Sequence, residues 1–339
     1  MPEVYLGSSP HIGTAARTSA IMAHVIIALI PSAVFGVVLY GLPALAVMAV
    51  SVISAAAAEA IFRALTKQEN RSGDLSAVLT GLLLALIVPP STPLWMIALG
   101  AVFAVVVAKE FFGGLGANVF NPALSGRAFL IMSFPAALTS WTLPRFAAVD
   151  TVSSASLIDV LSSATPLSLF KLGGTVEAVG SAFTAARLSA SPAYWDTVKT
   201  LFIGSRSGSI GESSILCILA GAVYLLAFRV IDWRAPLAMT ASAFALSFLL
   251  GVDPLFSILS GGLIFGAVFM ATDYTSAPLT ARGRLIFGAG AGIITVLIRR
   301  WGSYPEGVTY GILIMNAVTP FLNRLVQKKY GYVKAGAAR

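Results

Sequence analysis

Long apolar stretches constrain this chain more than any other feature of its sequence. The first covers roughly residues 17–40, and similar stretches recur as far as about residue 326. A helix needs ~20 apolar residues to cross the hydrocarbon core of a bilayer. Only 11% of the 339 residues are charged, whereas soluble domains contain about 25%. The sequence therefore predicts an all-α polytopic membrane protein with about ten transmembrane helices.

The expected helices form two groups of five, separated by one long polar segment. In order, they cover roughly 17–40, 42–63, 75–89, 93–112 and 120–139, then 213–230, 235–251, 254–271, 284–301 and 306–326. This pattern divides the chain into an N-terminal arm (1–16), a first five-helix repeat (17–139), a loop (140–212), a second five-helix repeat (213–326) and a basic tail (327–339). A repeat with an odd number of helices must insert upside down relative to the first, so we expect an inverted 5+5 repeat.

Sequence similarity between the halves supports the repeat. The third and eighth stretches are short, and each runs into a proline-containing polar segment, at residues 88–93 and 271–278. Both stretches are also preceded by an acidic residue, Asp74 or Asp253. Short, interrupted segments at matching places in two halves point to a binding site where the halves meet.

The distribution of basic residues predicts the orientation in the membrane. The formal net charge is +8, but the basic residues lie at the ends of apolar stretches, which argues against nucleic-acid binding. Connections on alternate sides differ strongly in Lys and Arg content, and only Arg299 and Arg300 break the pattern. The positive-inside rule then places both termini in the cytoplasm and the 140–212 loop outside. The first helix can serve as the insertion signal, because no signal peptide is evident.

The long loop contains one short motif that is a candidate for covalent modification. Asp159, Ser162, Ala164 and Thr165, with Ser163 between them, form a D-x-x-[ST]-x-A-T pattern. This spacing resembles the acceptor site of flavin transferases, which join FMN through its phosphate to a threonine hydroxyl. A threonine needs such help because its hydroxyl is a weak nucleophile. The alternative interpretation is a turn in which Ser162 or Thr165 caps a short helix.

Several separated blocks of the sequence resemble the NqrB/RnfD family. They are residues 108–114 (AKEFFGG), 116–130 (GANVFNPALSGRAFL), 271–273 with 278–280, 283–285, and 304–307 with 315–317. The short arm containing Ser9, Pro10 and His11 is most similar to the RnfD form. The NqrB form usually carries a longer N-terminal extension, which we expect to be absent here.

The resemblance implies a fold like that of urea transporters and a membrane subunit of an ion-pumping oxidoreductase that links ferredoxin and NAD. It implies FMN bound covalently to Thr165, installed by a flavin transferase, and a second, noncovalent flavin, either riboflavin or FMN. The implied partners are the other membrane and peripheral subunits of an Rnf-type complex, including a second subunit with covalent FMN. Whether the pumped ion is Na⁺ or H⁺ stays open.

The second flavin would need polar groups along one ring edge and an apolar wall elsewhere. Asn118, Phe120, Asn121, Arg127 and Phe129 could supply both, because Arg127 falls within an apolar stretch, where a charge usually faces the protein interior, and Pro122 can free backbone groups for a ligand. The alternative is that an asparagine caps a helix and Arg127 extends to the membrane interface.

Glu59 and Asp273 are the expected residues of an ion pathway, since acids within or near spans often serve this role. A salt bridge from Glu59 to Arg63, one turn later, is the alternative for the first, and a turn cap is the alternative for Asp273. We expect Asp253 to cap a helix and His24 to make a packing or polar contact between helices. The two histidines and the single cysteine, Cys217, predict no metal site and no disulfide.

Two rival functions fit parts of the pattern. One is an NqrB-type subunit of the Na⁺-pumping NADH:quinone reductase. The other, from a different class, is a flavin-free channel or carrier for a small solute with the same inverted-repeat body. The Asp159–Thr165 motif and the 116–130 block favour a flavin-carrying subunit.

Overall fold

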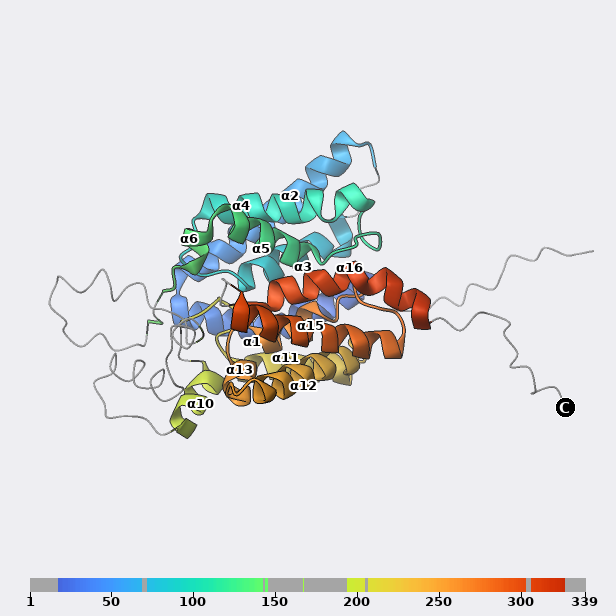
Figure 1. The fold of residues 1–339 in the computed structure, drawn as a ribbon. Coiled ribbons are helices and arrows are strands. Elements are labelled where there is room, and N and C mark those ends of the chain that lie inside the picture. Colours follow the sequence, from blue (N-terminus) through green and yellow to red (C-terminus); the bar gives the residue numbers. More distant parts are fainter. Residues whose placement is uncertain are drawn as a thin grey trace, which may run out of the picture.

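The computed structural model describes residues 18–68, 72–142, 144–145, 167, 194–204, 207–302 and 306–326, and within them it contains helices and no strands. The helices lie roughly side by side in one bundle (Figure 1). Four helical segments are long and apolar enough to cross a membrane: Thr18–Tyr40, Leu42–Leu65, Leu94–Phe112 and Ala281–Trp301. The prediction of a helical membrane protein is therefore confirmed.

The first group of helices begins with two long members and continues with shorter pieces. Its elements are α1 (Thr18–Tyr40), α2 (Leu42–Leu65), η1 (Ser72–Asp74), α3 (Ser76–Leu86), α4 (Leu94–Val102), η2 (Phe103–Val107), η3 (Glu110–Phe112), α5 (Pro122–Ser133) and α6 (Pro135–Thr139). Most boundaries lie within a few residues of those expected. The expected 120–139 helix is interrupted at Phe134, because Pro135 cannot continue the backbone ladder of α5.

The second group contains the largest departure from expectation. Its elements are α10 (Tyr194–Ile203), α11 (Ile215–Ala227), α12 (Arg234–Leu249), α13 (Pro254–Leu259), α14 (Leu263–Phe265), η4 (Gly266–Met270), α15 (Ala281–Trp301) and α16 (Val308–Val326). The prediction of one helix over 254–271 is wrong. The chain breaks at Gly261 and Gly262, whose φ angles of 64° and 65° lie in the left-handed region. Arg299 stabilises the break by donating to the carbonyls of Ser257, Ser260 and Gly261.

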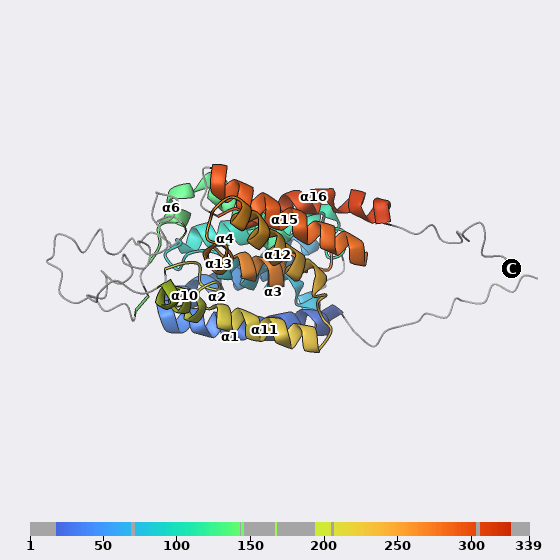
Figure 2. The same cartoon turned by 60° about the horizontal axis from the view of Figure 1, so that its bottom comes forward.

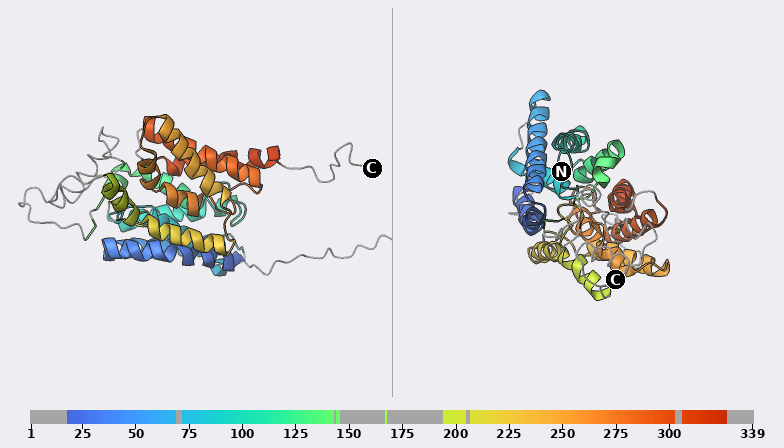
Figure 3. Two further views of the ribbon diagram at one scale, coloured as in Figure 1. Left: turned by 90° about the horizontal axis from the view of Figure 1, so that it is seen from below. Right: turned by 90° about the vertical axis from the view of Figure 1, so that its left-hand side faces the viewer.

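The two groups contact each other mainly through two pairs of helices. α1 packs along α11, and α5 packs against α16. Figures 2 and 3 show α1 and α11 side by side along one edge of the bundle. Within the groups, α2 packs on α3 and α4, and α12 packs on α15 and α13. His24 Nδ1 lies 2.8 Å from the Tyr224 hydroxyl across the α1–α11 contact, which confirms the polar contact expected for this histidine.

Exposed basic residues lie at both ends of the bundle, Arg229, Arg282 and Arg324 at one end and Arg145 and Arg300 at the other. α1 begins and α16 ends at the same end (Figure 1), which we call the basic end because the exposed Arg229, Arg282 and Arg324 lie there. At the other end, called the opposite end below, the Arg145 backbone N–H donates to the Leu39 carbonyl. Arg299 and Arg300, the two exceptions to the expected distribution of basic residues, lie within the last turn of α15 and not in a connection between helices.

Gly221 lets α11 approach α1 closely, and it provides a stability test. A Cβ at this position would lie 2.4 Å from the Ala28 carbonyl oxygen, a backbone atom that cannot move aside. We therefore expect Gly221→Ala to lower the free energy of unfolding by about 1–3 kcal/mol, as overpacking does. Thermal unfolding of the detergent-solubilised chain measures this. Gly73→Ala is the control, because a Cβ there meets nothing within 4 Å. Equal losses in both variants would contradict the close contact.

Candidate functional site

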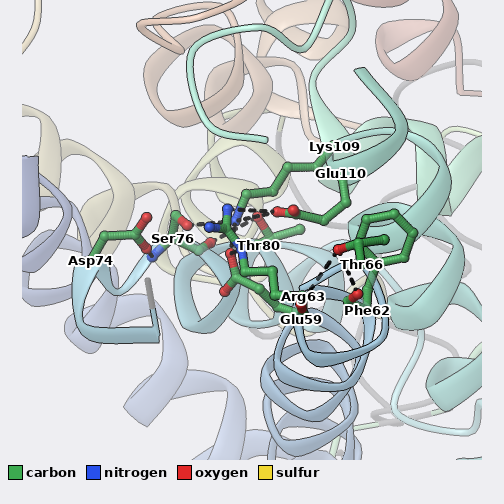
Figure 4. Close-up of polar contacts among 9 residues, drawn as sticks. All are labelled: Glu59, Phe62, Arg63, Thr66, Asp74, Ser76, Thr80, Lys109 and Glu110. Atoms are coloured by element: carbon green, nitrogen blue, oxygen red, sulfur yellow. Dashed lines mark hydrogen bonds and ion pairs between the residues drawn. The ribbon is translucent and has the colours of Figure 1, made fainter. Parts of the chain in front are cut away.

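A buried cluster of four charged residues lies near the basic end, and we call it the charge cluster. Glu59 and Arg63 come from α2, while Lys109 lies in the turn that follows η2 and Glu110 begins η3. Lys109 Nζ lies 2.8 Å from Glu59 Oε1, and Arg63 Nη2 lies 3.2 Å from Glu110 Oε1 (Figure 4). Arg63 Nε is also 3.6 Å from Glu59 Oε1, so the ion pair that was the alternative interpretation of Glu59 is present.

The charge cluster is deeply buried and electrically balanced. The side chains of all four residues are at most 4% exposed. Lys109 also donates to the Ser76 hydroxyl at 2.5 Å, which fixes the cluster to the start of α3. Two positive and two negative groups compensate one another, and a buried charge is tolerated only with such pairing. Glu59 is therefore held by a cation and is not open to the surroundings.

A second polar group joins the two halves of the chain beside this cluster. Asn118 Nδ2 donates to Thr275 Oγ1 at 2.7 Å, and that hydroxyl donates to Asp273 Oδ2 at 2.9 Å. Ser276 Oγ donates to the same carboxylate oxygen at 2.8 Å. Asn121 Nδ2 donates to the Met270 carbonyl at 3.5 Å. We call Asn118, Asn121, Asp273, Thr275 and Ser276 the polar junction.

Two small cavities, of ≈ 40 Å³ each, adjoin the polar junction. Both are lined by Asn121 and Asp273 on one side and by apolar side chains, including Met22 and Leu79, on the other. The first is also lined by Lys109 and Asn118. Among the described residues, Asn118 Oδ1 is buried without a hydrogen-bond partner. Buried polar atoms are rarely left in this state, so this oxygen marks a position where a donor from a ligand or water would be stabilised.

A π-helical turn leads directly to each of these polar groups. η2 ends just before Lys109, and η4 ends just before the segment that contains Asp273. In each turn the backbone bond spans five residues, from Ala108 N–H to the Phe103 carbonyl and from Ala271 N–H to the Gly266 carbonyl. Single π turns in helices are frequent at functional sites. They position the polar residues of both halves toward the same region.

The residues expected around a second flavin do not all lie together. Asn118 and Asn121 line the small cavities, and the Asn121 side chain also caps α5 by accepting from the Leu124 N–H at 3.2 Å. Arg127 forms an ion pair with Glu306, and the side chains of both are at most 10% exposed. Phe129 stacks on Phe103 with ring centroids 4.3 Å apart.

Other expected residues have simpler positions. Asp253 caps α13 by accepting from the Phe256 N–H at 2.8 Å, as predicted. The motif residues Asp159, Ser162, Ser163, Ala164 and Thr165 lie outside the described residues. Leu167, two positions after Thr165, is described and is 7% exposed. A Cβ built on Gly261 would lie 2.6 Å from its Cδ2, so Leu167 packs against the helix break at the opposite end.

The comparisons with known proteins decide the family. The model of the NQR2, RnfD, RnfE family matches residues 5–331. The chain belongs to the NQR2, RnfD, RnfE family. A 42% identical relative is the D subunit of the Na(+)-translocating ferredoxin:NAD(+) oxidoreductase complex of Acetobacterium woodii, aligned over 97% of this chain and 96% of the relative. Another, 40% identical, is the D subunit of the proton-translocating ferredoxin:NAD(+) oxidoreductase complex of Clostridium ljungdahlii, with 96% of each chain covered.

A third relative widens the range of organisms. The D subunit of the ion-translocating oxidoreductase complex of Stutzerimonas stutzeri is 38% identical, and the alignment covers 92% of this chain and 91% of the relative. In this NQR2, RnfD, RnfE family member, the blocks 108–114, 116–130 and 271–273 all contribute to the charge cluster or the polar junction. Lys109, Glu110 and Thr275 were missed as individual site residues, although each falls within or beside one of these blocks.

Proposed function

We propose that this chain is the membrane electron-transfer subunit of the RnfD type in an Rnf-type ferredoxin:NAD oxidoreductase that couples redox chemistry to ion translocation. The observation that carries the proposal is the match over nearly the full length to relatives whose names describe such a subunit. The chain acts with the other subunits of such a complex and has no complete activity alone. A flavin supplies one- and two-electron transfer, while the protein binds it, orients it and sets its electrostatic surroundings.

The proposed covalent site is the hydroxyl of Thr165, to which a flavin transferase joins FMN through its phosphate. The sequence motif from Asp159 to Thr165 supports this assignment. The distribution of Lys and Arg supports placing the 140–212 loop, and with it this threonine, outside the cytoplasm. Asp159 then belongs to what the transferase recognises and not to the electron path.

The proposed second flavin, riboflavin or FMN, binds noncovalently beside the polar junction. Asn118, Asn121 and Asp273 offer both donors and acceptors to the polar edge of the ring, and Met22 and Leu79 offer an apolar wall. The donor set therefore fits a flavin. The ring is larger than the two cavities, so its binding requires side chains to move, for which the unbranched Met22 is suited.

Removing the Asn118 amide tests this pocket. We expect Asn118→Ala to release most of the noncovalent flavin from the purified complex, because the half-buried Thr275 hydroxyl and the ring edge both lose a partner. Acid precipitation separates covalent flavin in the pellet from noncovalent flavin in the supernatant, and fluorescence measures each. Asn323→Ala is the control. Asn323 does not line either small cavity, and its side chain accepts a hydrogen bond from the Leu279 N–H. Full retention of supernatant flavin by Asn118→Ala would refute the assignment.

The proposed topology has ten membrane spans in an inverted 5+5 repeat, with both termini in the cytoplasm. The pairing of α1 with α11 and of α5 with α16 supports a two-fold relation between the halves. The break in the second half at Gly261 and Gly262 supports it too, since broken helices are typical of such repeats. The exposed arginines of the basic end support a cytoplasmic location for that end.

For the ion path we propose Asp273, with Glu59 in a supporting role. Asp273 accepts hydrogen bonds from two hydroxyl groups, and no cationic side chain pairs with it in the part of the chain that the structure describes. Glu59, in contrast, is neutralised by Lys109. The relatives at 42% and 40% identity bear different ions in their names, Na⁺ and H⁺, so overall similarity does not select the ion.

A further inference from the structure

A larger cavity, of ≈ 490 Å³, opens at the basic end and is distinct from the two small cavities. It lies between the α11–α12 connection, the start of α15 and the segment around Tyr274. Three of the residues that line it are arginines, namely Arg229, Arg234 and Arg284. Two carboxylates, Asp232 and Asp273, also line it. The cavity therefore has an excess of positive charge.

Two of these arginines are held in place by hydrogen bonds, but each keeps N–H donors for a ligand. Arg234 and Arg284 each donate from Nη1 to Asp232 Oδ2 at 2.8 Å, so two guanidinium groups meet at one carboxylate oxygen. Burial alone would raise the pKa of Asp232, but hydrogen bonds from the Arg234 backbone and from both guanidinium groups lower it, and the carboxylate stays charged. Each guanidinium has five N–H donors, and most of them find no acceptor among the described residues.

Arg229 adds a third cation, and among the described residues it is not bound to a carboxylate as Arg234 and Arg284 are. It is exposed and makes no ion pair within the described parts of the chain. A guanidinium fork of this kind matches phosphate geometry. The first turn of α12, at Arg234 and Ala235, also lines the cavity, and the amide groups of a helix N-terminus favour an anion there.

Apolar side chains border the same cavity on the outside of the bundle. Trp233 is 52% exposed, Leu279 is 73% exposed and Leu226 is 40% exposed, and all three line the opening. Tyr274 is 44% exposed beside them. Aromatic residues at the ends of membrane helices are typical of the bilayer interface. A free phosphate would use the arginines alone, whereas a ligand with acyl chains would also use this apolar border.

We propose that this cavity binds an anionic phospholipid. The headgroup phosphate lies among Arg229, Arg234 and Arg284, and the glycerol backbone and acyl chains lie against Leu226, Trp233 and Leu279. Basic pockets between membrane helices bind anionic headgroups in this way. The cavity shares Asp273 and Tyr274 with one of the small cavities, so the bound lipid closes the polar junction from the basic end.

Native mass spectrometry of the delipidated full-length chain in detergent tests the proposal. We expect one phosphatidylglycerol to bind, more tightly than phosphatidylcholine with the same acyl chains. Arg229→Gln and, separately, Arg234→Gln should each weaken phosphatidylglycerol binding by about fivefold, the effect of one cation near an anionic headgroup. Arg282→Gln is the matched control, because Arg282 is exposed on α15 but does not line the cavity. If Arg234→Gln fails to fold, Arg229→Gln decides alone.

Three results would overturn the proposal. Equal binding of the two phospholipids would exclude a headgroup site. Displacement of phosphatidylglycerol by equimolar inorganic phosphate would show that the site takes a free anion. Loss of noncovalent flavin, instead of lipid, from Arg229→Gln would show that the cavity is a flavin site.

Discussion

Replacing Thr165 by valine is expected to remove all covalently bound flavin from this chain. Valine keeps the β-branched shape but has no hydroxyl oxygen to form the phosphoester bond. In protein made together with a working flavin transferase, the wild-type band should fluoresce on a denaturing gel and the Thr165→Val band should not. Mass spectrometry of the intact chain should show the corresponding loss of the FMN adduct.

Two further variants make this result specific. Thr175→Val removes a hydroxyl from the same polar segment but outside the motif, and it should keep the fluorescent band. Thr165→Ser keeps a hydroxyl, and any modification it retains would identify the oxygen as the attachment point. Fluorescence that persists in Thr165→Val would contradict the assignment. An unmodified wild-type chain that carries a small solute across vesicles would favour the channel alternative.

Replacing Lys109 by methionine is expected to lower the free energy of unfolding by about 3–5 kcal/mol, the usual effect of removing one partner from a buried ion pair. The change leaves Glu59 and Glu110 buried with Arg63 alone, so the charge cluster gains an uncompensated negative charge. Ser76 loses its donor as well. Denaturant titration of the solubilised chain measures the loss in free energy of unfolding, and thermal unfolding gives the matching fall in melting temperature.

The double variant Glu59→Gln/Lys109→Met tests the electrostatic cause. It removes one charge of each sign and leaves Arg63 with Glu110, so it should be more stable than Lys109→Met alone. Lys67→Met is the control, because Lys67 is exposed and a surface change of this kind usually stays within about 0.5 kcal/mol. A Lys109→Met variant as stable as Lys67→Met would mean that the cluster does not contribute to stability.

Local sequence signals predicted several features of the structure well. Asp253 before Pro254 indicated a helix start, and the carboxylate does cap α13. The spacing of Glu59 and Arg63 indicated an ion pair as the alternative to an ion pathway, and that pair is present. These features depend on residues within one turn of each other, so the sequence carries them directly.

Features that depend on distant residues were not predictable in the same way. Lys109 lies at the end of an apolar stretch, where a basic residue usually faces the cytoplasm, but it is 1% exposed and pairs with Glu59, 50 residues earlier. The break at Gly261 lies inside a continuous apolar stretch, and the residue that stabilises it, Arg299, comes from α15. Pro135, in contrast, is a local signal for the interruption after α5, although the apolar pattern around it predicts a continuous helix.

The number of residues in each of the two π-helical turns determines which way the polar residues after it point. A residue in a helix is rotated by about 100° from its neighbour, so the extra residue of η2 sets the direction in which Lys109 leaves the helix. Removing one residue from Phe103–Val107 would restore an ordinary α-helix and turn Lys109 away from Glu59. The same holds for Gly266–Met270 and Asp273. An insertion or deletion in either turn would therefore dismantle the site without altering any of its residues.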